Sequence, residues 1–180
     1  MPPIDRSSSL IDVAFAVCTG LDEVGTCAVL TGGSAATFYA PSAYQSRDAD
    51  FVITMTTSPH AASALMTRLG YSEAGGIYSH ESGNLFTVEF PPGPLAVGGD
   101  LIERHDTVRR GTEVLYVLTR TDSVCDRLAG FYHWSDRSAL AAAVAVAKSG
   151  AVDLRAIEQW SGREHMIAKF ADFRDALEDQ

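Results

Sequence analysis

Two aspartates separated by one residue are the clearest chemical signal in this sequence. Asp48 and Asp50 open the segment Arg47–Ile53, which alternates and then turns apolar, a pattern typical of a strand. Side chains at positions i and i+2 of a strand point to the same face, so the two carboxylates should lie side by side. Such oxygens are the ligands that Mg²⁺ prefers together with substrate phosphates. The pair predicts a divalent-metal site, with room for the two ions that can clamp a phosphoryl transfer.

A glycine turn precedes this strand. The apolar run Cys27–Leu30 is typical of a buried strand, and Gly32, Gly33 and Ser34 follow it, leading into a predicted helix from Ser34 to Tyr39. Glycines let the backbone approach a phosphate closely, and a helix N-terminus offers free N–H groups and the positive end of the helix dipole. Either feature alone also suits an ordinary turn or a solvated strand face. Their order and spacing together favour an anion and metal site.

The succession of strand, Gly-Gly-Ser turn, helix and Asp-x-Asp strand resembles the nucleotidyltransferase superfamily, which includes DNA polymerase beta and the aminoglycoside nucleotidyltransferases. The stretches LTGGSAATFY and SRDADFVI are closer still to the AbiEii-like nucleotidyltransferase toxins of abortive-infection systems and their uncharacterised bacterial relatives. The resemblance implies a third carboxylate on a later strand. Glu89 is the best match for it, and Asp106 is the rival.

The resemblance extends into the C-terminal part, where these toxins carry a basic residue on a helix and an aspartate a turn or two later. Arg127 and Asp136 are the matching positions, although the toxins usually have Lys where this chain has Arg127. By resemblance, these two residues together with Gly32, Gly33 and Ser34 would bind the nucleotide. The implied activity is Mg²⁺-dependent transfer of an NMP from an NTP to the hydroxyl of an RNA end such as tRNA, a protein or a small molecule. An antitoxin protein is the implied partner.

Turn signals and hydrophobic periodicity predict an α/β (α+β) fold, with a mixed sheet and flanking helices over residues 1–120 and a helical C-terminal extension over residues 121–180. The predicted helices and strands, besides those above, are helices 8–21, 58–69, 123–133, 136–148, 153–160 and 164–177, a hairpin of strands 76–80 and 84–90, and strands 105–109 and 114–118.

The composition limits the functional classes. The net charge is −9 and the pI about 4.9, which argues against non-specific binding to a long nucleic acid, although 12 of the 14 basic residues are arginines suited to gripping phosphate. The three cysteines match no metal or redox motif and are interpreted as buried thiols in a reducing compartment. The longest apolar stretch, Ala139–Ala147, is too short to cross a bilayer, and the start does not resemble a signal peptide. We therefore expect a cytoplasmic protein with no membrane partner.

Three alternatives remain open at this point. A non-catalytic relative would keep the fold as a binding or interaction protein. A structural or oligomeric protein would carry the acidic pair as plain surface. An enzyme of the antibiotic-adenylylating kind would modify a small molecule in a deep polar pocket beside the metal site.

Overall fold

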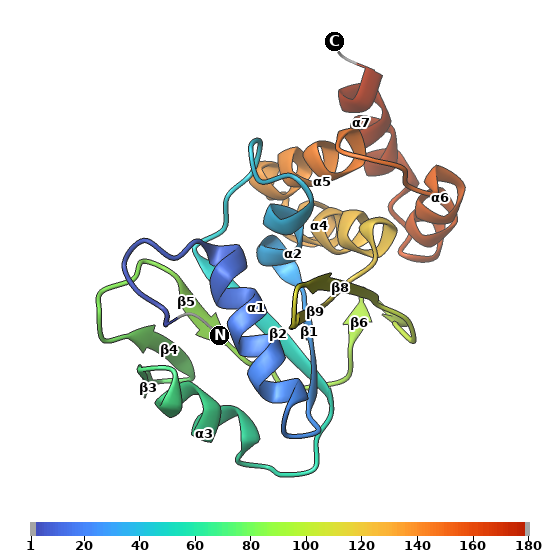
Figure 1. Ribbon diagram of the computed structural model, residues 1–180. Coiled ribbons are helices and arrows are strands. Elements are labelled where there is room, and N and C mark those ends of the chain that lie inside the picture. The colour runs from blue at the N-terminus through green and yellow to red at the C-terminus, as the bar shows by residue number, and fades with distance from the viewer. Residues whose placement is uncertain (1–2, 179–180) are drawn as a thin grey trace.

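The computed structural model describes residues 3–178 as a seven-stranded mixed sheet with helices packed around it and a group of helices at one end (Figure 1). The strand order is β3-β4-β5-β2-β1-β9-β8. A separate two-stranded ribbon of β6 (Ala96–Val97) and β7 (Asp100–Leu101) lies beside the C-terminal helices. The strands of the large sheet are β1 (Cys27–Leu30), β2 (Asp48–Met55), β3 (Tyr71–Ala74), β4 (Ile77–His80), β5 (Thr87–Glu89), β8 (Asp106–Arg110) and β9 (Glu113–Val117).

The chain starts with α1 (Leu10–Asp22), which forms because Ser9 and Asp12 make a reciprocal capping box ahead of an apolar stripe. It packs on β1 and β9. Helix α2 (Gly32–Tyr39) follows β1 directly and packs on β2. It begins two residues before the predicted Ser34, with Thr31 as its N-cap, so the two glycines form its first turn.

The centre of the sheet combines parallel and antiparallel pairs. β1 pairs antiparallel with β2 and parallel with β9, while β2 pairs parallel with β5. The predicted hairpin is present as the antiparallel pair β4-β5. The prediction missed β3, which pairs with β4 through a turn at Gly75 and Gly76, because the polar run at 72–73 lacks an apolar alternation. It also missed the short strands β6 (Ala96–Val97) and β7 (Asp100–Leu101).

Helix α3 (Ala61–Arg68) begins three residues later than predicted, because Ser58–His60 form a turn. From residue 120 the chain is helical, as predicted: α4 (Arg120–Trp134), α5 (Arg137–Lys148), α6 (Leu154–Arg163) and α7 (Ile167–Glu178). Figure 1 shows these four helices gathered at one end of the sheet. Helix α4 connects the two parts, since it packs against α2 as well as α5 and α6.

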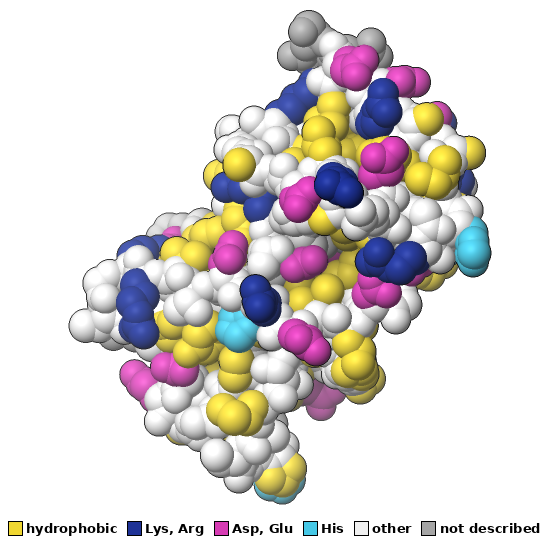
Figure 2. All heavy atoms as spheres, turned by 90° about the vertical axis from the view of Figure 1, so that its right-hand side faces the viewer, with side chains coloured by type: hydrophobic (Ala, Val, Ile, Leu, Met, Phe, Trp, Pro, Cys, Tyr) yellow, Lys and Arg dark blue, Asp and Glu magenta, His cyan; other side chains and the backbone are white. Residues whose placement is uncertain are grey.

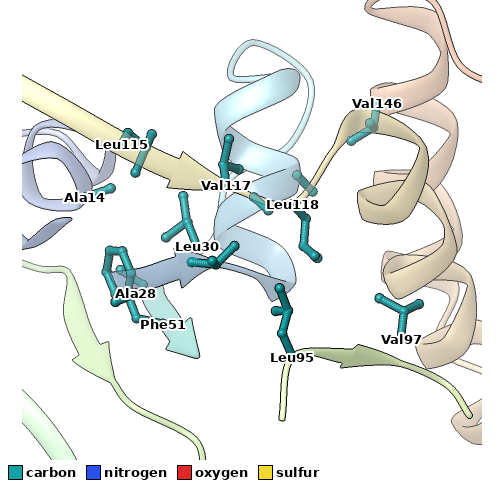
Figure 3. Packing of buried hydrophobic residues seen from close by; sticks show 14 of the residues in the cluster. Ala14, Ala28, Leu30, Phe51, Leu95, Val97, Leu115, Val117, Leu118 and Val146 are labelled. Carbon is teal, nitrogen blue, oxygen red and sulfur yellow. The ribbon is translucent and has the colours of Figure 1, made fainter. Parts of the chain in front are cut away.

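One hydrophobic core runs through both parts of the chain. It joins Val13 of α1 and Leu30 of β1 to Leu128 of α4 and Phe173 of α7, all of which are fully buried. Figure 3 shows Leu118, which follows the last residue of β9, between the sheet and the C-terminal helices. Burying apolar surface contributes roughly 25 cal/mol per Å². The shared core therefore fixes α4, and the side chains it carries, relative to the sheet. The division into a core of residues 1–120 and an extension stays a prediction.

Two further expectations concern the environment of the chain. Within residues 3–178, no helix has both the length and the apolar character that a membrane crossing requires. All three cysteines are free; Cys18 and Cys125 are buried as predicted, whereas Cys27 is only half-buried. Burial raises the pKa of the Cys18 thiol to about 12, which keeps it protonated.

Candidate metal and nucleotide site

Asp50 lies at the centre of a group of carboxylates on one face of the sheet. Asp48 is two residues away on the same strand, and Glu89 on β5 is the direct cross-strand neighbour of Asp50. Residues paired across parallel strands share a face, and neighbouring strands lie roughly 4.8 Å apart. The topology therefore brings together the three carboxylates predicted for the site.

Asp106, the rival third carboxylate, is excluded by the strand order. It lies on β8, three strands away from β2, and it pairs with Val117. Val117 aligns with Leu30, and Leu30 aligns with Phe51, the residue after Asp50. Because side chains alternate along a strand, Asp106 belongs to the face opposite that of Asp50. Its carboxylate instead accepts a 2.8 Å hydrogen bond from the Tyr39 hydroxyl.

The turn at Thr31–Ser34 holds the backbone of Asp50 from both sides. The Thr31 N–H donates to the Asp50 carbonyl at 2.9 Å, and the Asp50 N–H donates to the Ser34 hydroxyl at 3.2 Å. The Ser34 hydroxyl in turn donates to the Thr31 carbonyl at 2.7 Å. Ser34 is fully buried. Its hydroxyl is thus used to position the aspartate, and the predicted contact of Ser34 with the nucleotide stays a prediction.

The two glycines are required by close approach of protein side chains. Gly32 has a φ of +62°, and a Cβ there would lie 2.7 Å from Asp50 Oδ2. A Cβ on Gly33 would lie 2.9 Å from Ser46 Oγ and 3.1 Å from the Tyr44 hydroxyl. Only Gly32 of the three turn residues is part-exposed. Tyr44 and Ser46, in the loop before β2, therefore lie against Gly33, and the predicted contact of the two glycines with a phosphate stays a prediction.

The loop before β2 also contacts Asp48, one of the candidate metal ligands. The sequence did not predict this contact. The Ser46 N–H donates to the Thr37 hydroxyl at 2.8 Å, which fixes the loop on α2. The Ser46 hydroxyl then donates to Asp48 Oδ1 at 3.3 Å. The buried Ser46 could not be found from spacing, since its role depends on how the loop folds back over α2.

The neighbouring carboxylates raise the proton affinity of Asp50. Burial, together with the charges of Asp48 and Glu89, raises the pKa of Asp50 to about 6, while the nearby Arg127 opposes the rise. Like charges held together in a partly dry site favour either a proton or a bound cation. A positive charge bound near Asp50 would therefore stabilise this arrangement.

Arg127 supplies part of that charge. It lies on α4 with its guanidinium near Asp50, and Nη2 would be 3.7 Å from a Cβ on Gly32. Its Nε–H and one Nη2–H donate to Asp126 Oδ2 at 3.0 and 2.7 Å. The structure therefore brings Arg127 to the site, as the resemblance implied.

Asp136, the other residue carried over from the resemblance, has a structural role. It is the N-cap of α5, and its carboxylate accepts hydrogen bonds from the backbone N–H groups of Ser138 at 2.8 Å and Ala139 at 3.2 Å. An N-cap aspartate needs no ligand to explain it. The predicted nucleotide contact of Asp136 has no support in this geometry.

The donor set suits Mg²⁺ shared with a nucleotide better than a closed protein cage. Among residues 3–178, no three His, Cys, Asp or Glu side chains are arranged closely enough to hold a metal by themselves. Mg²⁺ is usually bound through one or two carboxylates plus substrate phosphates and water. Asp48 and Asp50 with Glu89 provide hard oxygens for such binding, and Gly32 places no side chain between Asp50 and Arg127.

The arrangement of the sheet and helices defines the fold class. The chain has a nucleotidyltransferase-like α/β fold, with a mixed sheet, flanking helices and a helical C-terminal part. It is similar over 98% of its length to an antigenic nucleotidyltransferase-like protein from Paracoccidioides brasiliensis, whose crystal structure it matches over 95% of that chain with a TM-score of 0.63. The two sequences are 15% identical, so the likeness concerns the fold. No model of a protein family and no curated protein matches this sequence.

Proposed function

We propose that this protein is a nucleotidyltransferase that moves an NMP from an NTP to an acceptor hydroxyl. The observation that carries the proposal is the position of Asp50, which has Asp48 and Glu89 on the same face of the sheet and the guanidinium of Arg127 nearby. The nucleotidyltransferase-like fold supports it. Mg²⁺ held by Asp48 and Asp50 would neutralise the phosphates and polarise the α-phosphoryl group.

The residues of the chain have separable roles in this reaction. The acceptor oxygen attacks the α-phosphorus, pyrophosphate leaves, and the acceptor proton must pass to a base. Glu89 is the carboxylate best placed to take that proton, because it flanks Asp50 on the neighbouring strand. Arg127 would stabilise the charge of the triphosphate. Gly32 is the first residue of α2, and its part-exposed backbone would allow the phosphates to approach.

The net charge of the protein limits which acceptors are favourable. The net charge of −9 is unfavourable for a long polyanion. On the face in Figure 2, acidic and basic side chains alternate with apolar ones, without a broad basic patch. An RNA end, a protein hydroxyl or a small molecule each requires only local contacts. A toxin role with an antitoxin partner rests on the resemblance of the Gly-Gly-Ser and Asp-x-Asp segments to the AbiEii-like proteins.

Calorimetric titration of the four NTPs with Mg²⁺ tests the proposal. We expect binding to the wild type that requires Mg²⁺ and disappears in Asp48→Ala/Asp50→Ala, with circular dichroism verifying that both proteins are folded. Transfer is then followed with α-labelled NTP and total tRNA, or with protein acceptors. Failure of the folded wild type to bind any NTP would contradict the proposal.

A non-catalytic nucleotidyltransferase-fold protein is the second candidate. Two observations favour it: the described residues contain no three-ligand metal group, and both Gly33 and Ser34 are buried. Such a protein would bind nucleotide weakly or not at all and would act through a partner. Nucleotide binding without release of pyrophosphate, over a panel of acceptors, would select this alternative.

A further inference from the structure

Asp126 and Arg127 form an ion pair between consecutive residues of α4. The Arg127 Nε–H and an Nη2–H both donate to the same oxygen, Asp126 Oδ2, at 3.0 and 2.7 Å. Neighbours i and i+1 on a helix project in different directions. The Arg127 side chain must therefore bend toward Asp126 to make these bonds. Because it is bent, its aliphatic part does not extend freely into solvent.

The pair is largely removed from solvent. Each of the two side chains is only 21% exposed. Burial opposes the charge of Arg127, but the contacts with Asp126 and the fields of Tyr44 and Asp50 outweigh it, so the pKa of the guanidinium lies above its usual value. Partly buried charge-assisted bonds of this kind are stronger and more directional than surface ion pairs.

The bonds to Asp126 leave the guanidinium able to bind another anion. Nε–H and one Nη2–H are used, so roughly three of the five N–H donors of a guanidinium remain. The group lies beside the part-exposed Gly32 and near Asp50. Its free donors are therefore placed where the phosphates of a nucleotide on the carboxylate site would come.

We propose that Asp126 is a positioning residue, which holds the Arg127 guanidinium beside Gly32 so that it meets the β and γ phosphates of a bound NTP. This inference rests on the proposed function. Asp126 itself does not touch the nucleotide. Without it, Arg127 would keep its charge and lose its fixed direction, and part of the binding free energy would be spent on ordering a long side chain.

A double-mutant cycle on Mg²⁺-NTP affinity tests the inference, using whichever of the four NTPs the wild type binds most tightly. Asp126→Asn keeps the size of the side chain and weakens the charged pair. We expect it to reduce NTP affinity by on the order of tenfold, and to reduce it by less than about twofold when Arg127 is already Ala. Affinity for the corresponding NMP, which has no β or γ phosphate, should change little in Asp126→Asn. A merely structural role would lower both affinities.

Asp122→Asn is the matched control, since it removes one acidic charge one turn earlier on α4. Its carboxylate accepts a bond from the Thr119 hydroxyl and makes no hydrogen bond with Arg127. We expect it to leave the ratio of NTP to NMP affinity unchanged. An equal effect of Asp126→Asn with and without Arg127, or NTP affinity equal to or tighter than that of the wild type, would overturn the inference while leaving the proposed function standing.

A second measurement needs no variant at Asp126. In ¹⁵N-labelled wild type, the Arg127 Nε–H resonance, assigned from its loss in Arg127→Lys, should exchange slowly and shift when Mg²⁺-NTP is added. Rapid exchange together with no shift on binding would overturn the positioning role even if Asp126→Asn failed to fold. Absence of NTP binding by the wild type is a distinct result, which would refute the proposed function and this inference together.

Discussion

The bare Cα of Gly32 faces the carboxylate of Asp50, and a Cβ added there would lie 2.7 Å from Asp50 Oδ2. The glycine also has a φ of +62°, a conformation that costs an L-residue roughly 1–2 kcal/mol. Two separate physical reasons thus require glycine at this position. One is the backbone conformation, and the other is the close approach of the central acidic side chain.

Gly32→Ala should therefore lose more stability than its backbone strain alone explains. We expect a decrease in the free energy of unfolding of about 2–4 kcal/mol, measured by urea denaturation, because the Cβ collides with Asp50 in addition to the strain.

Gly75→Ala is the matched control, since Gly75 has a φ of +64° and open space where its Cβ would lie. It should cost only about 1–2 kcal/mol. Shortening Asp50 to Ala should recover part of the difference for Gly32→Ala. Equal losses for the two glycine variants would show that Asp50 does not press on Gly32.

The raised pKa of Asp50 predicts a pH-dependent stability of the metal-free protein. Below about pH 4 the carboxyl is protonated in both the folded and the unfolded chain. Between about pH 4 and pH 6 the unfolded chain loses this proton first, so the folded chain binds more protons and its stability falls as the pH rises. Above about pH 6 the carboxyl is ionised in both states, and the stability contributed by this group falls no further.

Asp50→Asn should remove the fall in stability that Asp50 causes as the pH rises. In EDTA, the gain in the free energy of unfolding over the wild type should be larger at pH 8 than at pH 4 by on the order of 1–2 kcal/mol, after allowance for the partial exposure of the carboxyl. Asp172→Asn, at an exposed position on α7, controls for the change in net charge. A gain that is the same at both pH values would contradict the raised pKa.

Asp136→Ala distinguishes a helix cap from a nucleotide ligand. Loss of its bonds to the Ser138 and Ala139 N–H groups should cost about 1 kcal/mol of stability. The affinity for Mg²⁺-NTP should stay within twofold of that of the wild type, as measured by calorimetry under conditions where the variant is folded. A tenfold weaker affinity in a stable variant would restore the role implied by the resemblance.

Local patterns predicted the parts of the site that depend on one segment. The two-residue spacing of Asp48 and Asp50 correctly indicated a shared strand face, because the alternation of side chains is a property of a single strand. The third carboxylate could not be settled in this way. Glu89 and Asp106 both follow strand-like patterns, and only the placement of β5 beside β2, a non-local pairing, separates them.

Other features of the site were not predicted, for similar reasons. Asp126 gave no signal, since adjacent helix positions ordinarily do not face each other. The glycines were predicted to let a phosphate approach, which stays a prediction, and the sequence could not show that the side chains of Asp50, Ser46 and Tyr44 approach them. In α5, by contrast, the apolar stretch that is too short to cross a bilayer packs one face into the core, as its helical periodicity allows.

The two candidate third carboxylates give the sharpest test of the site. Glu89→Gln keeps the size of the side chain and removes a charge beside Asp50, so we expect Mg²⁺-dependent NTP affinity to fall about tenfold and any transfer rate to fall further, because Glu89 is the proposed base. Asp106→Asn removes a charge from the opposite face, where the carboxylate accepts the Tyr39 hydroxyl bond. It should cost up to about 1 kcal/mol of stability and leave NTP affinity unchanged. Calorimetry and urea denaturation of the two variants, side by side, measure both quantities. The reverse pattern, with binding lost in Asp106→Asn and kept in Glu89→Gln, would mean that the nucleotide binds on the other face of the sheet.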